Sequence, residues 1–188
     1  MHIALFGGRF DPPHNGHLHI AREVLKEAFG IDEVWLVPAN THPWRPIVAS
    51  GEDRLVMTKF LEEDKIKVSD VDIKKGGETF TIDTIRELEK TTNNSYIFIC
   101  GADQIKSFHL WKGYEELEEK LHFLVFPRIG YDIPKELPKN FTLMTPTDFI
   151  ATDDSSTEIR ERIKHGVPIS DLVPKKIAEY IAEKGLYK

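Results

Sequence analysis

Short apolar runs alternate along this chain with segments in which apolar residues recur every three or four positions. The runs predict buried β-strands, and the recurring positions predict amphipathic helices. Residues 66–73 alternate only in part and are expected to be extended. The predicted strands cover residues 3–6, 34–37, 96–100, 122–126 and 141–144, and the predicted helices cover residues 18–28, 52–61, 81–90, 156–164 and 174–184.

This order of elements predicts the fold class. Strands that are apolar throughout and are separated by helices are typical of a parallel sheet covered on both faces. We therefore expect an α/β fold: a Rossmann-like, doubly wound parallel sheet with helices on both faces and a C-terminal helical segment. The length of 188 residues fits one domain, residues 1–188, and the helices of residues 150–188 end it.

Composition narrows the class of protein. The chain has 25 Lys and Arg against 31 Asp and Glu, a formal charge of −6, which argues against a general nucleic-acid binder. A small anionic substrate stays compatible, because it needs only a local group of positive charges. The one cysteine, Cys100, excludes an intramolecular disulfide and suits a reducing compartment.

Neither a membrane span nor a signal peptide is evident in the sequence. No apolar run reaches the roughly 18 residues that a transmembrane helix needs. Residues 1–6 have no basic region ahead of their apolar stretch, as a signal peptide would. We therefore expect a cytoplasmic protein without a membrane or nucleic-acid partner.

The first predicted strand leads directly into the sequence GGRFDPPHNGH, residues 7–17. In an open parallel sheet, ligands bind at the carboxyl ends of the strands. Gly7 and Gly8 lack a Cβ, so a phosphate could approach the backbone closely. Asn15 is expected to cap the next helix, whose positive end would face an anion. This junction predicts a phosphate site, with Asp11 and the two prolines stiffening the loop.

Two histidines belong to the same stretch. His14 and His17 are three residues apart, which makes them neighbours in the first turn of a helix. Imidazole N–H groups there can donate hydrogen bonds to phosphate oxygens and stabilise charge on a departing pyrophosphate. Another hypothesis is the metal site of a hydrolase, built from His14, His17, His19 and Asp11. His19 would however point away from the other two on a helix.

The sequence DSSTEIR, residues 154–160, precedes a predicted helix near the C-terminus. Ser155 and Glu158 have the spacing of a capping box, which has a purely structural explanation. Residues 7–17 resemble the GxFDPxHxGH signature of the nucleotidyltransferases related to class I aminoacyl-tRNA synthetases, and residues 154–160 resemble the ISSTxIR motif of that superfamily. Arg9 and Asp154 depart from the usual residues of these motifs.

The resemblance implies an ATP site that the C-terminal helices complete. Catalysis would rest on His14, His17 and Arg160. The residues that the resemblance implies for ATP binding are Gly7, Gly8, Arg9, Phe10, His14, Gly16, His17, Gly101, Asp103, Ser155, Ser156 and Arg160.

Further stretches resemble the bacterial nicotinate mononucleotide adenylyltransferases nearly end to end. They are residues 37–40, 43–46, 79–84, 101–103, 111, 127–131, 171–174 and 185–188. The resemblance implies adenylyl transfer from ATP, with Mg²⁺, to nicotinate mononucleotide in NAD biosynthesis. The products would be nicotinate adenine dinucleotide and pyrophosphate.

The resemblance also implies roles in the mononucleotide site, which holds no metal ligand. Trp111 would stack on the pyridine ring, and the backbone at Phe80 and Thr81 would bind the nicotinate carboxylate. Arg45 would meet the mononucleotide phosphate, and Asn40 would complete the site. Asp103, at the ATP side, would accept hydrogen bonds from the adenosine ribose. The segment His42-Pro43-Trp44 departs from the family's Pro-Pro-His, so no role is carried over to His42.

Three alternatives remain beside this hypothesis and the hydrolase. A phosphopantetheine adenylyltransferase shares both phosphate motifs, but those chains are usually shorter and lack the context of Trp111 and of Phe80-Thr81. A cytidylyltransferase is less favoured because its base-reading signature is not evident. A catalytically silent nucleotide-binding protein would keep the ATP site alone. The sequence leaves the oligomeric state open, with a homo-oligomer as one option.

Overall fold

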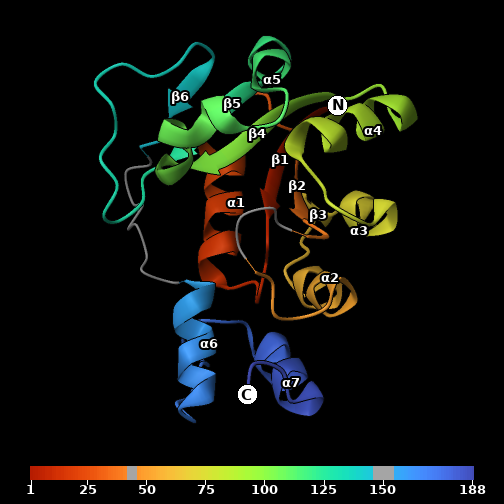
Figure 1. Ribbon diagram of the computed structural model, residues 1–188, viewed down its shortest axis with the longest axis vertical. Helices are drawn as coiled ribbons and strands as arrows, with labels where there is room; N and C mark the ends of the chain where they lie inside the picture. Colours follow the sequence, from red (N-terminus) through yellow and green to blue (C-terminus); the bar gives the residue numbers. More distant parts are fainter. Residues whose placement is uncertain (42–45, 146–154) are drawn as a thin grey trace.

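The structure is a computed structural model, and it describes residues 1–41, 46–145 and 155–188 (Figure 1). The expectations for Arg45, for the segment His42-Pro43-Trp44 and for Asp154 lie outside the described residues. No helix in the described ranges is long and apolar enough to cross a membrane.

In the described ranges, six parallel strands form one sheet in the order β3-β2-β1-β4-β5-β6. The chain moves outward from β1 first in one direction and then in the other, so the switch point lies between β1 and β4. The predicted doubly wound parallel sheet is confirmed. The strands are β1 (His2–Gly8), β2 (Glu33–Pro38), β3 (Ile66–Val68), β4 (Ser95–Gly101), β5 (His122–Phe126) and β6 (Phe141–Leu143).

Helices cover both faces of the sheet. Ala4 and Phe6 of β1 join the core on one face, and Ile3 and Leu5 join the core on the other, because successive side chains of a strand point to opposite sides. Side chains of α1 (Asn15–Glu27), α2 (Gly51–Lys59), α6 (Ser156–Lys164) and α7 (Lys175–Lys184) complete the first core. The second core is completed by α4 (Thr81–Thr91), the 3₁₀-helix η1 (Ala102–Leu110) and α5 (Tyr114–Lys120).

The sequence prediction was wrong for part of residues 66–73. Strand β3 ends at Val68, and a short helix, α3 (Val71–Lys75), follows it. The partial alternation arises because Asp72 is buried within α3 while Val71 packs against the second core. A buried polar residue in a short helix can therefore give the alternating pattern of apolar and polar residues that is typical of a strand.

The C-terminal helices lie together at the lower end of the molecule in Figure 1, below the sheet. The loop between them reaches back to the start of α1, where the Asn15 N–H donates to the Leu172 carbonyl at 2.9 Å. From α7, the Tyr180 hydroxyl donates to Asp53 Oδ1 of α2 at 2.9 Å. The last helices thus pack against elements formed by the first third of the chain.

Candidate active site

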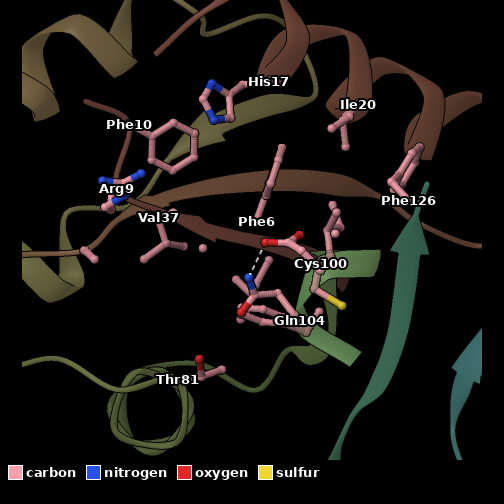
Figure 2. Close-up of a pocket in the computed structure, with 18 of the residues that line it drawn as sticks. Phe6, Arg9, Phe10, His17, Ile20, Val37, Thr81, Cys100, Gln104 and Phe126 are labelled. Carbon is pink, nitrogen blue, oxygen red and sulfur yellow. Dashed lines mark hydrogen bonds between the residues drawn. The ribbon is translucent and has the colours of Figure 1, made fainter. Parts of the chain in front are cut away.

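A cavity of about 770 Å³ lies at the carboxyl ends of β1 and β4. This is the switch point of the sheet, where doubly wound proteins bind their ligands. Figure 2 shows His17 and Phe10 on one side of the cavity and Thr81, at the start of α4, on the opposite side. The predicted site residues that line it are Gly7, Gly8, Arg9, Phe10, His14, Gly16, His17, Phe80, Thr81, Gly101, Asp103, Trp111, Ser155 and Ser156.

Two predicted site residues of the described ranges contact other groups instead. The Asn40 side-chain amide donates to the Gly77 carbonyl at 2.9 Å. Arg160 Nη1 donates to the Asp11 carbonyl at 2.7 Å, and its Nη2 donates to Thr157 Oγ1 at 3.2 Å. In this structure Arg160 therefore holds the main chain of the first loop and does not line the cavity.

The rings of the two loop histidines lie in contact, with centroids 3.7 Å apart and planes tilted by 38°. The His14 backbone N–H donates to His17 Nδ1 at 3.2 Å, which leaves the proton of a neutral His17 on Nε2. Burial, followed by the charge of Arg128, lowers the pKa of His14 to about 3. Burial also holds the pKa of His17 well below its usual value, and neighbouring His14 lowers it further. Both rings are therefore neutral N–H donors at neutral pH.

The expected cap of α1 was assigned to the wrong residue. Helix α1 begins at Asn15, and His14, in extended conformation, occupies the N-cap position. The Asn15 side chain turns instead to the C-terminal segment, where its amide donates to the Asp171 carbonyl at 3.1 Å. A contact between residues far apart in the sequence has replaced the local capping bond that asparagine usually makes.

Glycines at the carboxyl ends of β1 and β4 allow close packing. A Cβ on Gly7 would lie 3.0 Å from Phe98 Cζ, and one on Gly8 would lie 3.2 Å from Phe10 Cε2. A Cβ on Gly101 would come within 2.4 Å of Asp103 Oδ1. These glycines let aromatic rings and one carboxylate approach the main chain at the edge of the cavity.

Asp103 is placed as a hydrogen-bond acceptor beside the end of β4. Its Oδ2 accepts from Gln104 Nε2 at 2.6 Å and from Arg128 Nη1 at 3.1 Å. Its Oδ1 is buried and has no partner among the described residues. A buried oxygen without a partner is costly, so a ligand hydroxyl would fit there.

The start of α6 closes the loop side of the cavity. Ser155 is the N-cap, and its Oγ accepts from the Glu158 N–H at 3.1 Å, as predicted. The Glu158 carboxylate accepts from Arg162 Nη2 at 2.7 Å and does not return to the cap. Ser156 Oγ donates to the Pro12 carbonyl at 2.9 Å, which ties α6 to the first loop.

The opposite side of the cavity combines an aromatic surface with a helix start. Trp111 packs edge-on against Phe98, with ring centroids 5.8 Å apart, and its Nε1 is buried without a hydrogen-bond partner in the described part of the chain. Phe80 is the N-cap of α4, and Thr81 is its first residue. The first N–H groups of a helix have no partner within the helix, so they can receive an anion.

Sequence reasoning missed one residue of α2 that holds the first loop in place. Arg54 is fully buried in α2, and its guanidinium donates to four backbone carbonyls. Its only signal in the sequence is a charged residue on the apolar side of a predicted helix. The carbonyls are those of Arg9 at 2.7 Å, Ala39 at 2.6 Å, Asn40 at 2.8 Å and Ala49 at 3.2 Å.

The Asp11 carboxylate also holds the first loop in place. It is fully buried, and it accepts from the N–H groups of Val48 at 2.7 Å and Ala49 at 3.0 Å. Tyr187, next to the last residue, donates to it as well. These contacts agree with the stiffening of the loop expected from the sequence.

A doubly wound sheet with a glycine-histidine loop at its switch point defines the class of nucleotide-binding α/β proteins. Residues 5–162 match the family model described as cytidylyltransferase-like. A probable nicotinate-nucleotide adenylyltransferase of Shouchella clausii is 38% identical, over 98% of this chain and 96% of the relative. One of Halalkalibacterium halodurans is 40% identical, over 99% of this chain and 91% of the relative. The chain belongs to the cytidylyltransferase-like family and, within it, to the nicotinate-nucleotide adenylyltransferases.

Solved structures share the fold. The Plasmodium falciparum nicotinic acid mononucleotide adenylyltransferase complexed with NaAD superposes with a TM-score of 0.82 at 22% identity, covering 99% of this chain and 97% of that one. The same protein complexed with APC gives a TM-score of 0.78, with 99% and 96% covered. The family that the motifs predicted from the sequence is confirmed, and so is the Rossmann-like architecture.

Proposed function

We propose that this protein transfers the adenylyl group of ATP to nicotinate mononucleotide, as a step of NAD biosynthesis. The observation that carries the proposal is one continuous cavity that joins two different binding surfaces. One surface has the N–H donors of His14 and His17 at the start of α1. The other has the Trp111 ring beside the start of α4. A reaction between two nucleotides needs such a paired site.

The ATP would lie along the loop side of the cavity. Its triphosphate would accept hydrogen bonds from the two imidazoles, from the Ser155 hydroxyl and from the N–H groups at the start of α6, where Ser155 and Ser156 lie. The buried Oδ1 of Asp103 supports a contact with a ribose hydroxyl, because it lacks a partner among the described residues. Arg160 would contribute by holding the Asp11 carbonyl, and it would reach phosphate only after leaving that contact.

The mononucleotide would lie on the opposite side. Its pyridine ring would stack on Trp111, and its carboxylate would bind at the backbone of Phe80 and Thr81. We assign the phosphate of the mononucleotide to the neighbourhood of Asn40 and Arg45.

In the proposed reaction, a phosphate oxygen of the mononucleotide attacks the α-phosphorus of ATP. The new oxygen–phosphorus bond forms as the bond to the bridging oxygen breaks, and pyrophosphate leaves with the electron pair. The imidazole N–H groups would stabilise the charge that develops on the pyrophosphate. No protein nucleophile is required; Cys100 stays a thiol because burial raises its pKa to about 12.

We propose that Mg²⁺ enters with ATP, held by phosphate oxygens, and neutralises part of the polyphosphate charge. Within the ranges that the structure describes, no three His, Cys, Asp or Glu side chains form a group that could hold a metal ion. We further propose a cytoplasmic protein that acts on ATP and nicotinate mononucleotide, with no nucleic-acid partner and with a homo-oligomer as one form of assembly.

A pyrophosphate-release assay tests the function. Purified protein is given ATP and Mg²⁺ with nicotinate mononucleotide, nicotinamide mononucleotide or 4′-phosphopantetheine, side by side. We expect turnover to be fastest with nicotinate mononucleotide. Turnover of 4′-phosphopantetheine alone would replace the proposed substrate, and tight ATP binding without pyrophosphate release would favour a silent nucleotide-binding protein.

A further inference from the structure

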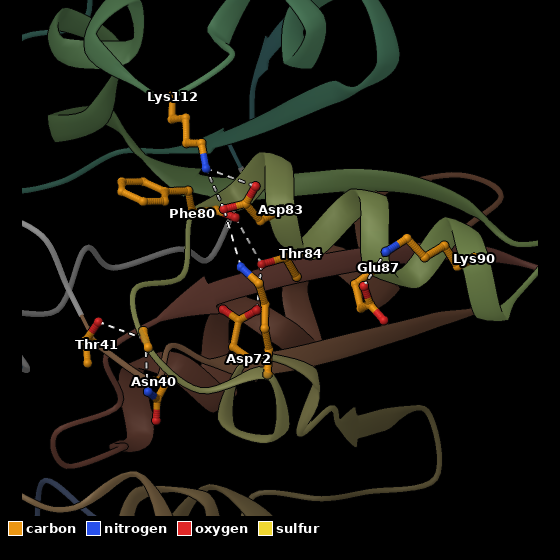
Figure 3. Close-up of polar contacts among 11 residues, drawn as sticks. Asn40, Thr41, Asp72, Phe80, Asp83, Thr84, Glu87, Lys90 and Lys112 are labelled. Carbon is orange, nitrogen blue, oxygen red and sulfur yellow. Dashed lines mark hydrogen bonds and ion pairs between the residues drawn. The ribbon is translucent and has the colours of Figure 1, made fainter.

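A group of charged side chains, which the proposed function does not use, lies at the start of α4. Asp83, in the first turn of α4, accepts from Lys112 Nζ with both carboxylate oxygens, at 2.9 and 3.1 Å. Lys75 Nζ lies 3.4 Å from the same carboxylate. Figure 3 shows Lys112 reaching Asp83 across the gap between their two segments. The ammonium groups of Lys112 and Lys75 thus flank the Asp83 carboxylate, on the side of the cavity where the mononucleotide is proposed to bind.

Buried polar side chains that line the cavity lie beside this group. Thr79 is buried and lines the cavity, and its hydroxyl lies beside the Asp72 carboxylate, with which it interacts. Asp72 also lines the cavity, and it accepts from Thr84 Oγ1 at 2.7 Å. Burial raises the pKa of Asp72, and the hydrogen bonds from Thr84 and Thr79 and the charge of Lys75 oppose that rise.

The segment of residues 111–113 links the aromatic surface to this charge. Gly113 has a φ of +66°, and a Cβ there would lie 3.2 Å from Ile82 of α4. Lys112 Nζ lies 4.8 Å from the centroid of the Phe80 ring, and Lys112 itself lines the cavity. The same three residues therefore supply the Trp111 ring and place a positive charge at the start of α4.

We propose that Lys112 is a specificity-determining residue that selects an acceptor with an anionic substituent on its aromatic ring. This inference rests on the proposed function. A carboxylate bound at the first N–H groups of α4 would lie beside Asp83, whose charge repels it. Lys112, together with Lys75, offsets that repulsion. A neutral carboxamide at the same place gains nothing from the offset, so the acid is preferred over the amide.

The competing explanation is that the ion pair between Lys112 and Asp83 only holds two segments together. The chain offers a matched control for it. Arg86 of α4 pairs with Glu116 of α5, and the Arg86 side chain is 50% exposed, against 51% for Lys112. Arg86 does not line the cavity. Arg86→Met therefore removes an equally exposed tie to the same region, from a residue that does not reach the cavity.

The experiment measures KM and kcat for nicotinate and nicotinamide mononucleotide at saturating ATP and Mg²⁺. The proteins are the unaltered chain, Lys112→Met, Asp83→Asn, the double variant and Arg86→Met. Where the amide reacts too slowly, its inhibition constant against the acid replaces KM. We expect Lys112→Met to raise KM for the acid roughly three- to tenfold, less at high salt, and to leave the amide within about twofold.

The double variant separates charge from structure. We expect it to recover a KM for the acid within about twofold of the unaltered protein, because both charges leave together. Asp83→Asn alone is expected to lower KM for the acid. Equal losses for both acceptors in Lys112→Met, no recovery in the double variant, or the same shift in Arg86→Met would overturn the inference. Failure of the unaltered protein to use nicotinate mononucleotide would instead overturn the proposed function, and this inference with it.

Discussion

The Tyr187 hydroxyl donates a hydrogen bond to Asp11 Oδ1 at 2.9 Å, joining the next-to-last residue of the chain to the glycine-histidine loop. Tyr187 is buried, and Asp11 is fully buried. The same loop is held through its carbonyls by Arg160 and Ser156 of α6. The C-terminal segment therefore contributes to the proposed ATP site by fixing the loop that carries the histidines.

Tyr187→Phe should weaken the loop without unfolding the protein. The Asp11 carboxylate loses one of the three donors that it has among the described residues, in a buried environment, which costs about 1–3 kcal/mol. We expect KM for ATP to rise several-fold, and KM for nicotinate mononucleotide to change little. The matched control is Tyr180→Phe, which removes a tyrosine–aspartate bond of the same length, to Asp53, away from the loop. Equal effects of the two variants on KM for ATP would contradict the prediction.

Arg54→Met should lower stability strongly. Four carbonyls lose their donor, and the Asp11 carboxylate loses the positive charge beside it. Breaking a buried charged network of this kind costs about 3–5 kcal/mol. Urea unfolding followed by circular dichroism measures the loss. Lys59→Met, at the exposed end of the same helix, is the control and should change stability by less than about 0.5 kcal/mol.

His17→Ala should abolish most of the activity while the protein stays folded. Its Nε2–H is the donor that we assign to the phosphates, and loss of one such donor typically costs about 100- to 1000-fold in kcat. Pyrophosphate release measures the activity, and thermal unfolding checks the fold. Near-normal turnover of a folded His17→Ala protein would remove the role that we give to this residue.

Stability of the free protein should fall as the pH drops below the pKa of an unfolded histidine. The pKa of His14 is about 3 in the folded state, against 6.5 as its ordinary value. Between these pH values His14 is protonated in the unfolded chain and neutral in the folded chain. For this group, the free energy of unfolding therefore decreases by about 1.4 kcal/mol for each unit by which the pH falls. Its full contribution is present only above pH 6.5.

Urea unfolding at about pH 7 and about pH 5 tests this dependence, with a loss of about 2 kcal/mol expected from His14. His14→Asn should show a smaller loss over the same range, because asparagine does not titrate. The exposed His109 offers the control, since His109→Asn should keep the full slope. An identical slope in His14→Asn and the unaltered protein would contradict the assignment.

The sequence by itself determined the alternation of strands and helices, the parallel sheet and the family. Apolar runs and helical spacing are local signals, and the motifs of residues 7–17 and 154–160 are contiguous. Local spacing also predicted correctly that His14 and His17 are neighbours and that Ser155 caps a helix. The prediction from local spacing was wrong for Asn15, whose side-chain amide binds a distant carbonyl. It was also wrong for residues 69–73, where an aspartate is buried.

Only the tertiary structure decided which residues support the site. Tyr187 meets Asp11 across 176 positions, and Lys112 meets Asp83 across 29, so no local pattern reveals either contact. The structure also decided that both loop histidines are neutral, because burial, which sets their pKa, depends on every element packed around them. Local spacing identified the groups that would touch the nucleotides, and long-range packing decided what holds those groups in place and what charge they carry.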